Sequence, residues 1–151
     1  MTALLMAIHI LAALIWVGGM FFAHMFLRPA ALTLPTEQRV DLWFGVLSRF
    51  FPWVWGVIVA LPLSGYGLLL TAFAGQKGTS HSVQIMQLLG WTMILIFVFL
   101  YVAFYRNMAQ RVRKRLIPEA GLYLNRIRIL VSVNLILGIT TVLVAASGRY
   151  G

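Results

Sequence analysis

The stretch from Met6 to Arg28 is apolar enough to cross a bilayer, yet it carries ionisable and sulfur-containing side chains on one face. An α-helix turns by about 100° per residue, so these side chains fall within a stripe roughly 80° wide. The stripe consists of Met6, His9, Ala13, Trp16, Met20 and His24. Imidazole gains nothing from contact with hydrocarbon. We therefore expect this face to contact other protein segments, a cofactor or water rather than lipid.

Three further stretches are long and apolar enough to span a membrane. Only 10% of the 151 residues are charged, whereas a soluble domain of this size would carry about 25%. We predict an all-α integral membrane protein, a single domain in which four transmembrane helices form a bundle. The spans are expected at residues 2–27, 50–73, 83–105 and 129–146. No Lys or Arg precedes the first span, so we expect a retained helix rather than a cleaved leader.

The connecting segments carry their own signals. The residues from Glu37 to Arg49 are expected to form a short amphipathic piece ahead of the second span. Pro62 should kink that span, because it removes a backbone donor in mid-helix. Small residues beyond the proline would let a neighbouring backbone or a flat ligand come close. The acidic residues are all expected in loops: Glu37, Asp41 and Glu119.

The distribution of positive charge predicts the orientation. Of the 12 Lys and Arg residues, all but Lys77 and Arg149 fall in the first and third connecting segments. Positive charge concentrates on the cytoplasmic side of membrane proteins, so both termini and the second connection are expected outside. The net charge of +9 then reflects topology and contact with anionic lipid head groups rather than binding of nucleic acid.

His9 lies about two turns into the first span, where an ionisable residue indicates a functional site. Neutral imidazole suits copper, zinc or haem iron. The alternative is a structural imidazole bonded to a backbone carbonyl or to Asn134. His81 is expected in a loop, either solvated or paired with His9 as the second ligand of a haem. His9 and His24 would be about 22 Å apart on one helix, too far to share an iron.

Met20 and His24 are four positions apart, so their side chains can meet and would suit Cu(I). The alternative is ordinary core packing of the methionine and an interfacial position for the histidine. The chain has no cysteine, so any metal must bind through His, Met or oxygen. Trp16 and Asn134 are expected to face a ligand, because buried polar groups at that depth need partners.

Three arginines stand next to predicted spans and could bind an anion such as a haem propionate: Arg49, Arg126 and Arg128. The alternative is that they only set the topology. No nucleophile accompanied by a base, no phosphate-binding loop and no carboxylate pair is recognisable, so the sequence assigns no catalytic residue.

The first-helix motif His9-x6-Trp16-Val17-Gly18-Gly19-Met20-Phe21, closed by Arg28-Pro29, resembles the copper resistance protein D (CopD) family and, more distantly, HemJ-type membrane proteins. Arg49-Phe50, Arg106 and the run from Arg128 to Gly148 also fit. The resemblance implies a four-helix inner-membrane unit, with His9 carried over by the motif. It implies copper homeostasis, or, on the HemJ side, haem b and protoporphyrinogen oxidation. Asn134 stands where many CopD-like chains have Glu, a departure that bears on proton coupling.

Three functions follow as hypotheses. The first is a copper-handling protein that binds or transports the metal through the His/Met stripe of the first helix. The second is a haem b protein that transfers electrons or acts like HemJ. The third is a small structural subunit, packed in a homo-oligomer or a larger membrane complex.

Overall fold

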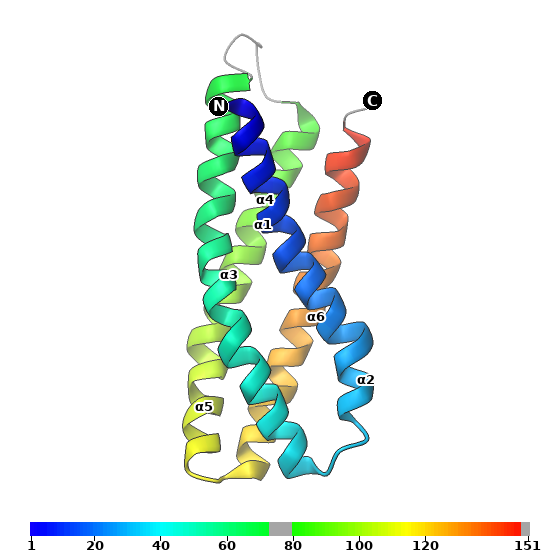
Figure 1. Cartoon of the computed structure of the whole chain (residues 1–151), viewed down its shortest axis with the longest axis vertical. Helices are drawn as coiled ribbons and strands as arrows, with labels where there is room; N and C mark the ends of the chain where they lie inside the picture. Colours follow the sequence, from blue (N-terminus) through cyan, green and yellow to red (C-terminus); the bar gives the residue numbers. More distant parts are fainter. Residues whose placement is uncertain (73–79, 149–151) are drawn as a thin grey trace.

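The computed structural model describes residues 1–72 and 80–148, and every regular element in these ranges is helical. Four of its helical stretches are long and apolar enough to cross a membrane: Thr2–Ala31, Thr36–Thr71, His81–Arg113 and Ile117–Ser147. They lie side by side as an elongated bundle (Figure 1). The predicted all-α bundle of four membrane-spanning helices is therefore confirmed.

The first stretch begins with helix α1, Thr2–Phe22, which continues through a π-helical turn, Ala23–Leu27 (η1). A short helix α2, Arg28–Ala31, then completes it. The chain thus stays helical about one turn past the predicted end of the span. Pro29 lies in the first turn of α2, where a missing N–H does no harm.

Helix α3 runs without interruption over Thr36–Ala72 and contains Pro52 and Pro62. The amphipathic piece expected from Glu37 to Arg49 is thus the first part of this helix and continues directly into the second span. Its apolar face, which includes the buried side chains Val40, Trp43 and Leu47, continues in register into the span. One helix buries this whole face and leaves its polar side in water.

Helix α4, His81–Leu100, likewise continues through a second π-helical turn, Tyr101–Tyr105 (η2), into α5, Arg106–Arg113. After a tight turn, α6 covers Ile117–Ser147. The basic stretch before the fourth span is thus a helical hairpin.

The expectation that the acidic residues lie in loops is also wrong, because Glu37 and Asp41 belong to α3 and Glu119 belongs to α6. Ion pairs stabilise these carboxylates at their positions on the helices. Arg111 Nε lies 2.8 Å from Glu119 Oε2, and Arg115 Nη1 lies 3.1 Å from Asp41 Oδ2.

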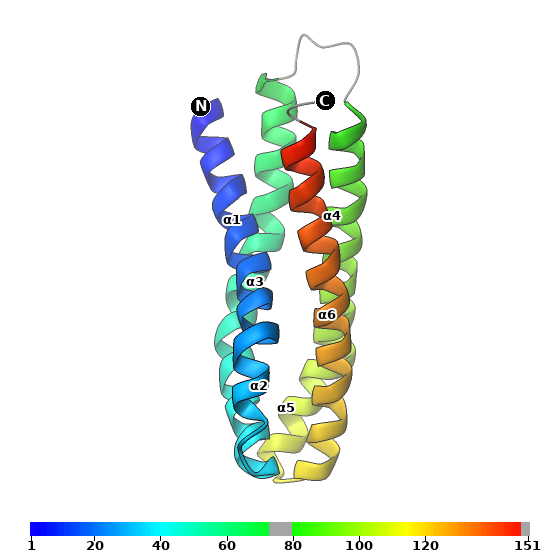
Figure 2. The same ribbon diagram turned by 90° about the vertical axis from the view of Figure 1, so that its right-hand side faces the viewer.

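The bundle consists of two helix pairs. Helix α1 packs mainly against α3, and α4 mainly against α6, with α6 also touching α1 and α3 (Figure 2). Glycines allow close approach at two points of this packing. A Cβ on Gly19 would lie 2.5 Å from the Phe50 ring, and a Cβ on Gly138 would lie 2.8 Å from Val17.

Burial is uneven along the bundle. No residue in 1–11, 81–92 or 139–148 is buried, so α1, α4 and α6 pack loosely at the end where α1 begins and α6 finishes, whereas Ser64 and Leu68 of α3 are buried there. The core occupies the middle of the bundle and the opposite end, where α5 lies. The charge count compares ten Lys and Arg residues on one side of the membrane with two on the other, Lys77 and Arg149. Both of these fall outside the described residues, so the orientation stays a prediction.

Candidate functional site

His9 makes a side-chain contact between α1 and α3. Its Nδ1 lies 2.9 Å from Ser64 Oγ, and Ser64 is a buried residue of α3. The neighbouring Gly65 leaves room for the imidazole, because a Cβ there would lie 3.2 Å from His9 Cε1. The small residues after Pro62 thus admit side chains of α1.

The hydrogen bonds of Ser64 determine which nitrogen of His9 carries the proton. Ser64 Oγ lies 2.6 Å from Ala60 O and 3.1 Å from Leu61 O, and a carbonyl can only accept. A serine hydroxyl has one proton, which it therefore donates to its own helix. Toward His9 the oxygen can only accept, so His9 Nδ1 carries the proton and donates it. The lone pair of a neutral His9 is then on Nε2.

His24 repeats this arrangement toward the other end of the bundle. Its Nδ1 lies 3.1 Å from Ser132 Oγ on α6, and Ser132 donates to Arg128 O at 2.9 Å. The same argument places the proton on His24 Nδ1 and the lone pair on Nε2. His24 lies in the π-helical turn η1, so its side-chain direction depends on that turn. Both histidines of α1 therefore have one nitrogen held by a serine.

Between the two histidines the stripe is packed inside the protein. Trp16 and Met20 are 2% and 3% exposed, and the Trp16 ring meets Phe97 of α4 edge to face with ring centroids 6.3 Å apart. The burial of Trp16 and Met20 agrees with the expectation that this face contacts protein rather than lipid. Met6, at the loosely packed end, remains 44% exposed.

Asn134 is buried in the centre of the bundle, at 2% exposure. Its Nδ2 donates to Met93 O at 3.2 Å, while its Oδ1 has no hydrogen-bond partner among the described residues. The alternative that Asn134 bonds to His9 is wrong, because the His9 ring nitrogen meets Ser64 and the Asn134 amide meets α4. An unpartnered buried acceptor costs about 1–3 kcal/mol, which makes Oδ1 a polar point open to a donor.

His81 is not in a loop but is the first residue of α4, and it is exposed. It lies at the end of the bundle where α1 begins (Figure 1). Within residues 1–72 and 80–148, no three His, Cys, Asp or Glu side chains come together in a group that could hold a metal ion. The three histidines therefore do not form one preformed centre.

The three arginines expected at an anion site have different surroundings. Arg49 is exposed and donates to Gly45 O at 3.0 Å. Arg126 lies over the Phe104 and Tyr123 rings, 5.6 Å and 5.9 Å from their centroids. Arg128 lies two positions after Arg126 on a different side of α6, and it is partly buried.

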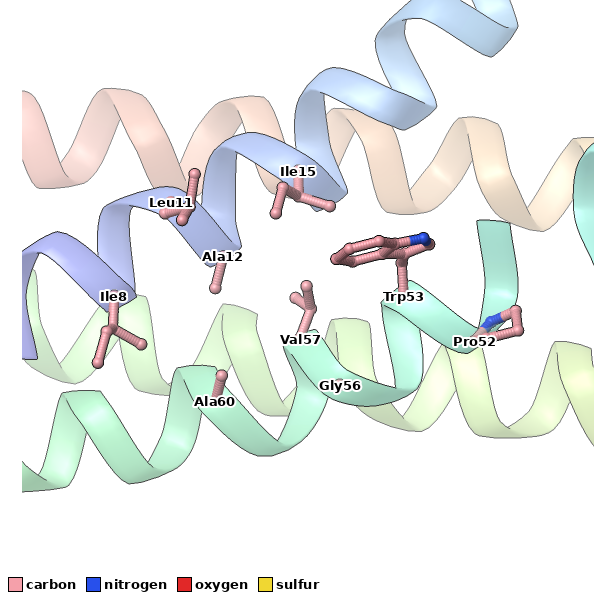
Figure 3. A pocket seen from close by; sticks show the side chains of 9 residues that line it. All are labelled: Ile8, Leu11, Ala12, Ile15, Pro52, Trp53, Gly56, Val57 and Ala60. Atoms are coloured by element: carbon pink, nitrogen blue, oxygen red, sulfur yellow. The ribbon is translucent and has the colours of Figure 1, made fainter. Parts of the chain in front are cut away.

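A groove of about 390 Å³ runs between α1 and α3. Figure 3 shows its lining, which is apolar apart from the Trp53 indole nitrogen: Ile8, Leu11, Ala12, Ile15, Pro52, Trp53, Gly56, Val57 and Ala60. The groove brings no acid, base or metal ligand together, so the candidate site is the histidine stripe of α1.

Sequence reasoning missed Ser64 and Ser132 as partners of the histidines. The signal available for each serine was a hydroxyl inside the predicted span of a neighbouring helix. No protein-family model, curated protein or solved structure matches the chain. The chemistry must therefore be argued from this geometry.

Proposed function

We propose that the chain is a protein of copper homeostasis in the bacterial inner membrane, which binds a copper ion at His9 and passes it along α1 toward His24. The observation that carries the proposal is the shared hydrogen-bonding pattern of the two histidines, each of which has Nδ1 bonded to a serine hydroxyl. Metal-binding histidines typically donate one ring N–H to a fixed acceptor, and this orients the other nitrogen toward the metal.

The side chains between the histidines favour copper over other metals. Met20 supplies a thioether on the same face, and imidazole with thioether is a donor set that suits Cu(I). The histidines are 15 positions apart, which corresponds to about 22 Å along a helix, so they serve as two separate stations. Met20 lies one helical turn before His24, so its thioether would bind the copper ion on its way from His9 to His24.

Metal analysis and a visible absorption spectrum of protein purified from copper-grown cells test the proposal. The expected result is copper in simple proportion to the chain, with no Soret band. His9→Gln should lose most of the copper, since an amide is a poor substitute for an imidazole ligand. His81→Gln is the matched control, because His81 is an exposed histidine at the same end of the bundle. Full copper content in His9→Gln would refute the proposal.

A haem b protein is the second candidate, favoured by the loose packing at the end that holds His9 and the start of α4. His9 Nε2 and His81 would then be the axial ligands. The same spectrum separates the two functions, because haem gives a Soret band that both His9→Gln and His81→Gln should weaken. If the purified protein contains neither copper nor haem, the remaining function is that of a structural subunit.

A further inference from the structure

A second polar site lies along η2 and α5. It is a pocket of about 330 Å³ lined by two tyrosines, two arginines, an alanine and a glutamine: Tyr101, Tyr105, Arg106, Ala109, Gln110 and Arg113. The π-helical turn Tyr101–Tyr105 forms its upper part. Such turns widen a helix locally and are frequent at functional sites.

Within residues 1–72 and 80–148, no carboxylate pairs with the arginines of this pocket. The chain has three acidic residues in all. Glu119 pairs with Arg111, whereas Glu37 and Asp41 pair with Arg115. Arg106 and Arg113 line the pocket without a carboxylate, beside the amide of Gln110 and the hydroxyls of the two tyrosines. All of these groups can donate hydrogen bonds to an anion.

The pocket lies at the depth of the lipid head groups. Tyr101 is 20 positions beyond His81, or about 30 Å along the helix, which equals the thickness of the hydrocarbon core. Tyrosine is enriched at this boundary, where its ring is in the apolar region and its hydroxyl reaches the polar one. Trp55, which is 37% exposed and lies 5.3 Å from the Tyr101 ring, adds an apolar surface next to the pocket.

We propose that this pocket binds the phosphate of an anionic phospholipid, with Arg106 and Arg113 as its charged contacts. The guanidinium groups match phosphate geometry, and the hydroxyl of Tyr105 and the amide of Gln110 complete the donor set. The acyl chains would lie against Trp55 and the adjacent face of α4. This is a discrete site with one bound lipid, beyond the general attraction of basic segments to anionic membranes.

The test measures which lipids stay with the protein in nanodiscs made from zwitterionic phosphatidylcholine and anionic phosphatidylglycerol. Enrichment of the anionic lipid around the wild-type chain is compared with Arg106→Gln/Arg113→Gln. The matched control is Arg49→Gln/Lys114→Gln, which removes the same charge from exposed residues outside the pocket. A basic residue near an anionic surface contributes about 1 kcal/mol, so each lost arginine should weaken binding about fivefold.

The pocket variant should lose at least about fivefold more lipid affinity than the control, because both of its charges contact one phosphate. Arg106→Lys/Arg113→Lys should recover part of the binding through charge alone. Equal losses in the pocket and control variants would overturn the proposal in favour of diffuse attraction. If inorganic phosphate binds the detergent-solubilised wild-type chain as tightly as the anionic lipid does, and Arg106→Gln/Arg113→Gln abolishes that binding, free phosphate rather than a lipid is the ligand and the proposal is overturned.

Discussion

At the scale of single residues, two serines decide what the histidines of α1 can do. Ser64 and Ser132 each give their only proton to a carbonyl of their own helix, at 2.6 Å and 2.9 Å. Each oxygen can then only accept from the imidazole that faces it. The consequence is that each histidine, when neutral, has its lone pair on Nε2, and neutral imidazole is the form that binds a metal.

Ser64→Ala removes the acceptor of His9 Nδ1 and should lower copper affinity about 10- to 100-fold, as losses of such supporting hydrogen bonds usually do. Equilibrium titration of copper against a competing chelator measures the change. Ser48→Ala is the control, since Ser48 also bonds to its own helix on α3, with Gly45 O at 3.0 Å. Equal affinities in the two variants would show that Ser64 does not position His9.

At the scale of the helices, the neighbouring glycines of α1 have opposite surroundings. A Cβ on Gly19 would meet the Phe50 ring of α3 at 2.5 Å, whereas a Cβ on Gly18 has nothing within 4 Å. Gly19 is thus required for contact between α1 and α3, and Gly18 is not. The adjacent pair offers a direct comparison within one helix.

Gly19→Ala should destabilise the bundle by about 1–3 kcal/mol, because the aromatic ring must move to admit the methyl group. Gly18→Ala should be neutral, or stabilising by up to about 1 kcal/mol, through better helix propensity. Unfolding of the detergent-solubilised protein by increasing sodium dodecyl sulfate measures both. A Gly19→Ala protein as stable as Gly18→Ala would contradict the packing of α1 on α3.

The turn from α5 to α6 combines backbone strain with ion pairing. Arg115 has φ 57°, and the Leu116 N–H donates to Arg111 O while the Arg115 N–H donates to Val112 O. These bonds form a helix ending that normally has glycine at the left-handed position. The Arg115 side chain compensates in part, through its pairs with Asp41 and Glu37.

Arg115→Gly should change stability little, because relief of about 1 kcal/mol of backbone strain offsets exposed ion pairs worth about 0–1 kcal/mol. Arg115→Ala loses the ion pairs and keeps the strain, so it should be less stable than Arg115→Gly by about 1 kcal/mol. The same detergent unfolding experiment compares them. If the alanine variant is the more stable of the two, the left-handed turn is not strained.

At the scale of the whole molecule, both ends of the chain's helical part and the start of α4 lie at one end, and the α5–α6 turn lies at the other (Figure 1). The basic residues of α5 and of the turn to α6 gather at the second end: Arg106, Arg111, Arg113, Lys114 and Arg115. Positive residues mark the cytoplasmic side, so the end with His9 should be outside.

Single cysteines test this orientation in a chain that has none of its own. Ser147→Cys at the end of α6 should react with a membrane-impermeant maleimide on intact cells, whereas Lys114→Cys should react only after the cells are opened. Both positions are exposed, so access through the membrane decides the result. The opposite labelling pattern would place His9 on the cytoplasmic side.

The fold follows from the sequence more fully than the site does. Hydrophobic length predicts four helices, and helical periodicity places Trp16 and Met20 inside. Ser64 and Ser132 are 55 and 108 positions from their histidines, and periodicity within one helix carries no information about its register against another. The sequence also failed to predict that Glu37 and Glu119 are helical. Ion pairs between helices support the helix ends there, and such pairs cannot be deduced from the sequence of one helix.

The claim that neutral His9 has its proton on Nδ1 and its lone pair on Nε2 is tested most directly by nitrogen NMR of protein labelled at both ring nitrogens of histidine. The His9 signals, assigned by their loss in His9→Gln, should show a protonated Nδ1 and an unprotonated Nε2. Added Cu(I) should then shift the Nε2 signal. A protonated Nε2 in the metal-free protein, or His9 signals that do not respond to Cu(I), would contradict the account.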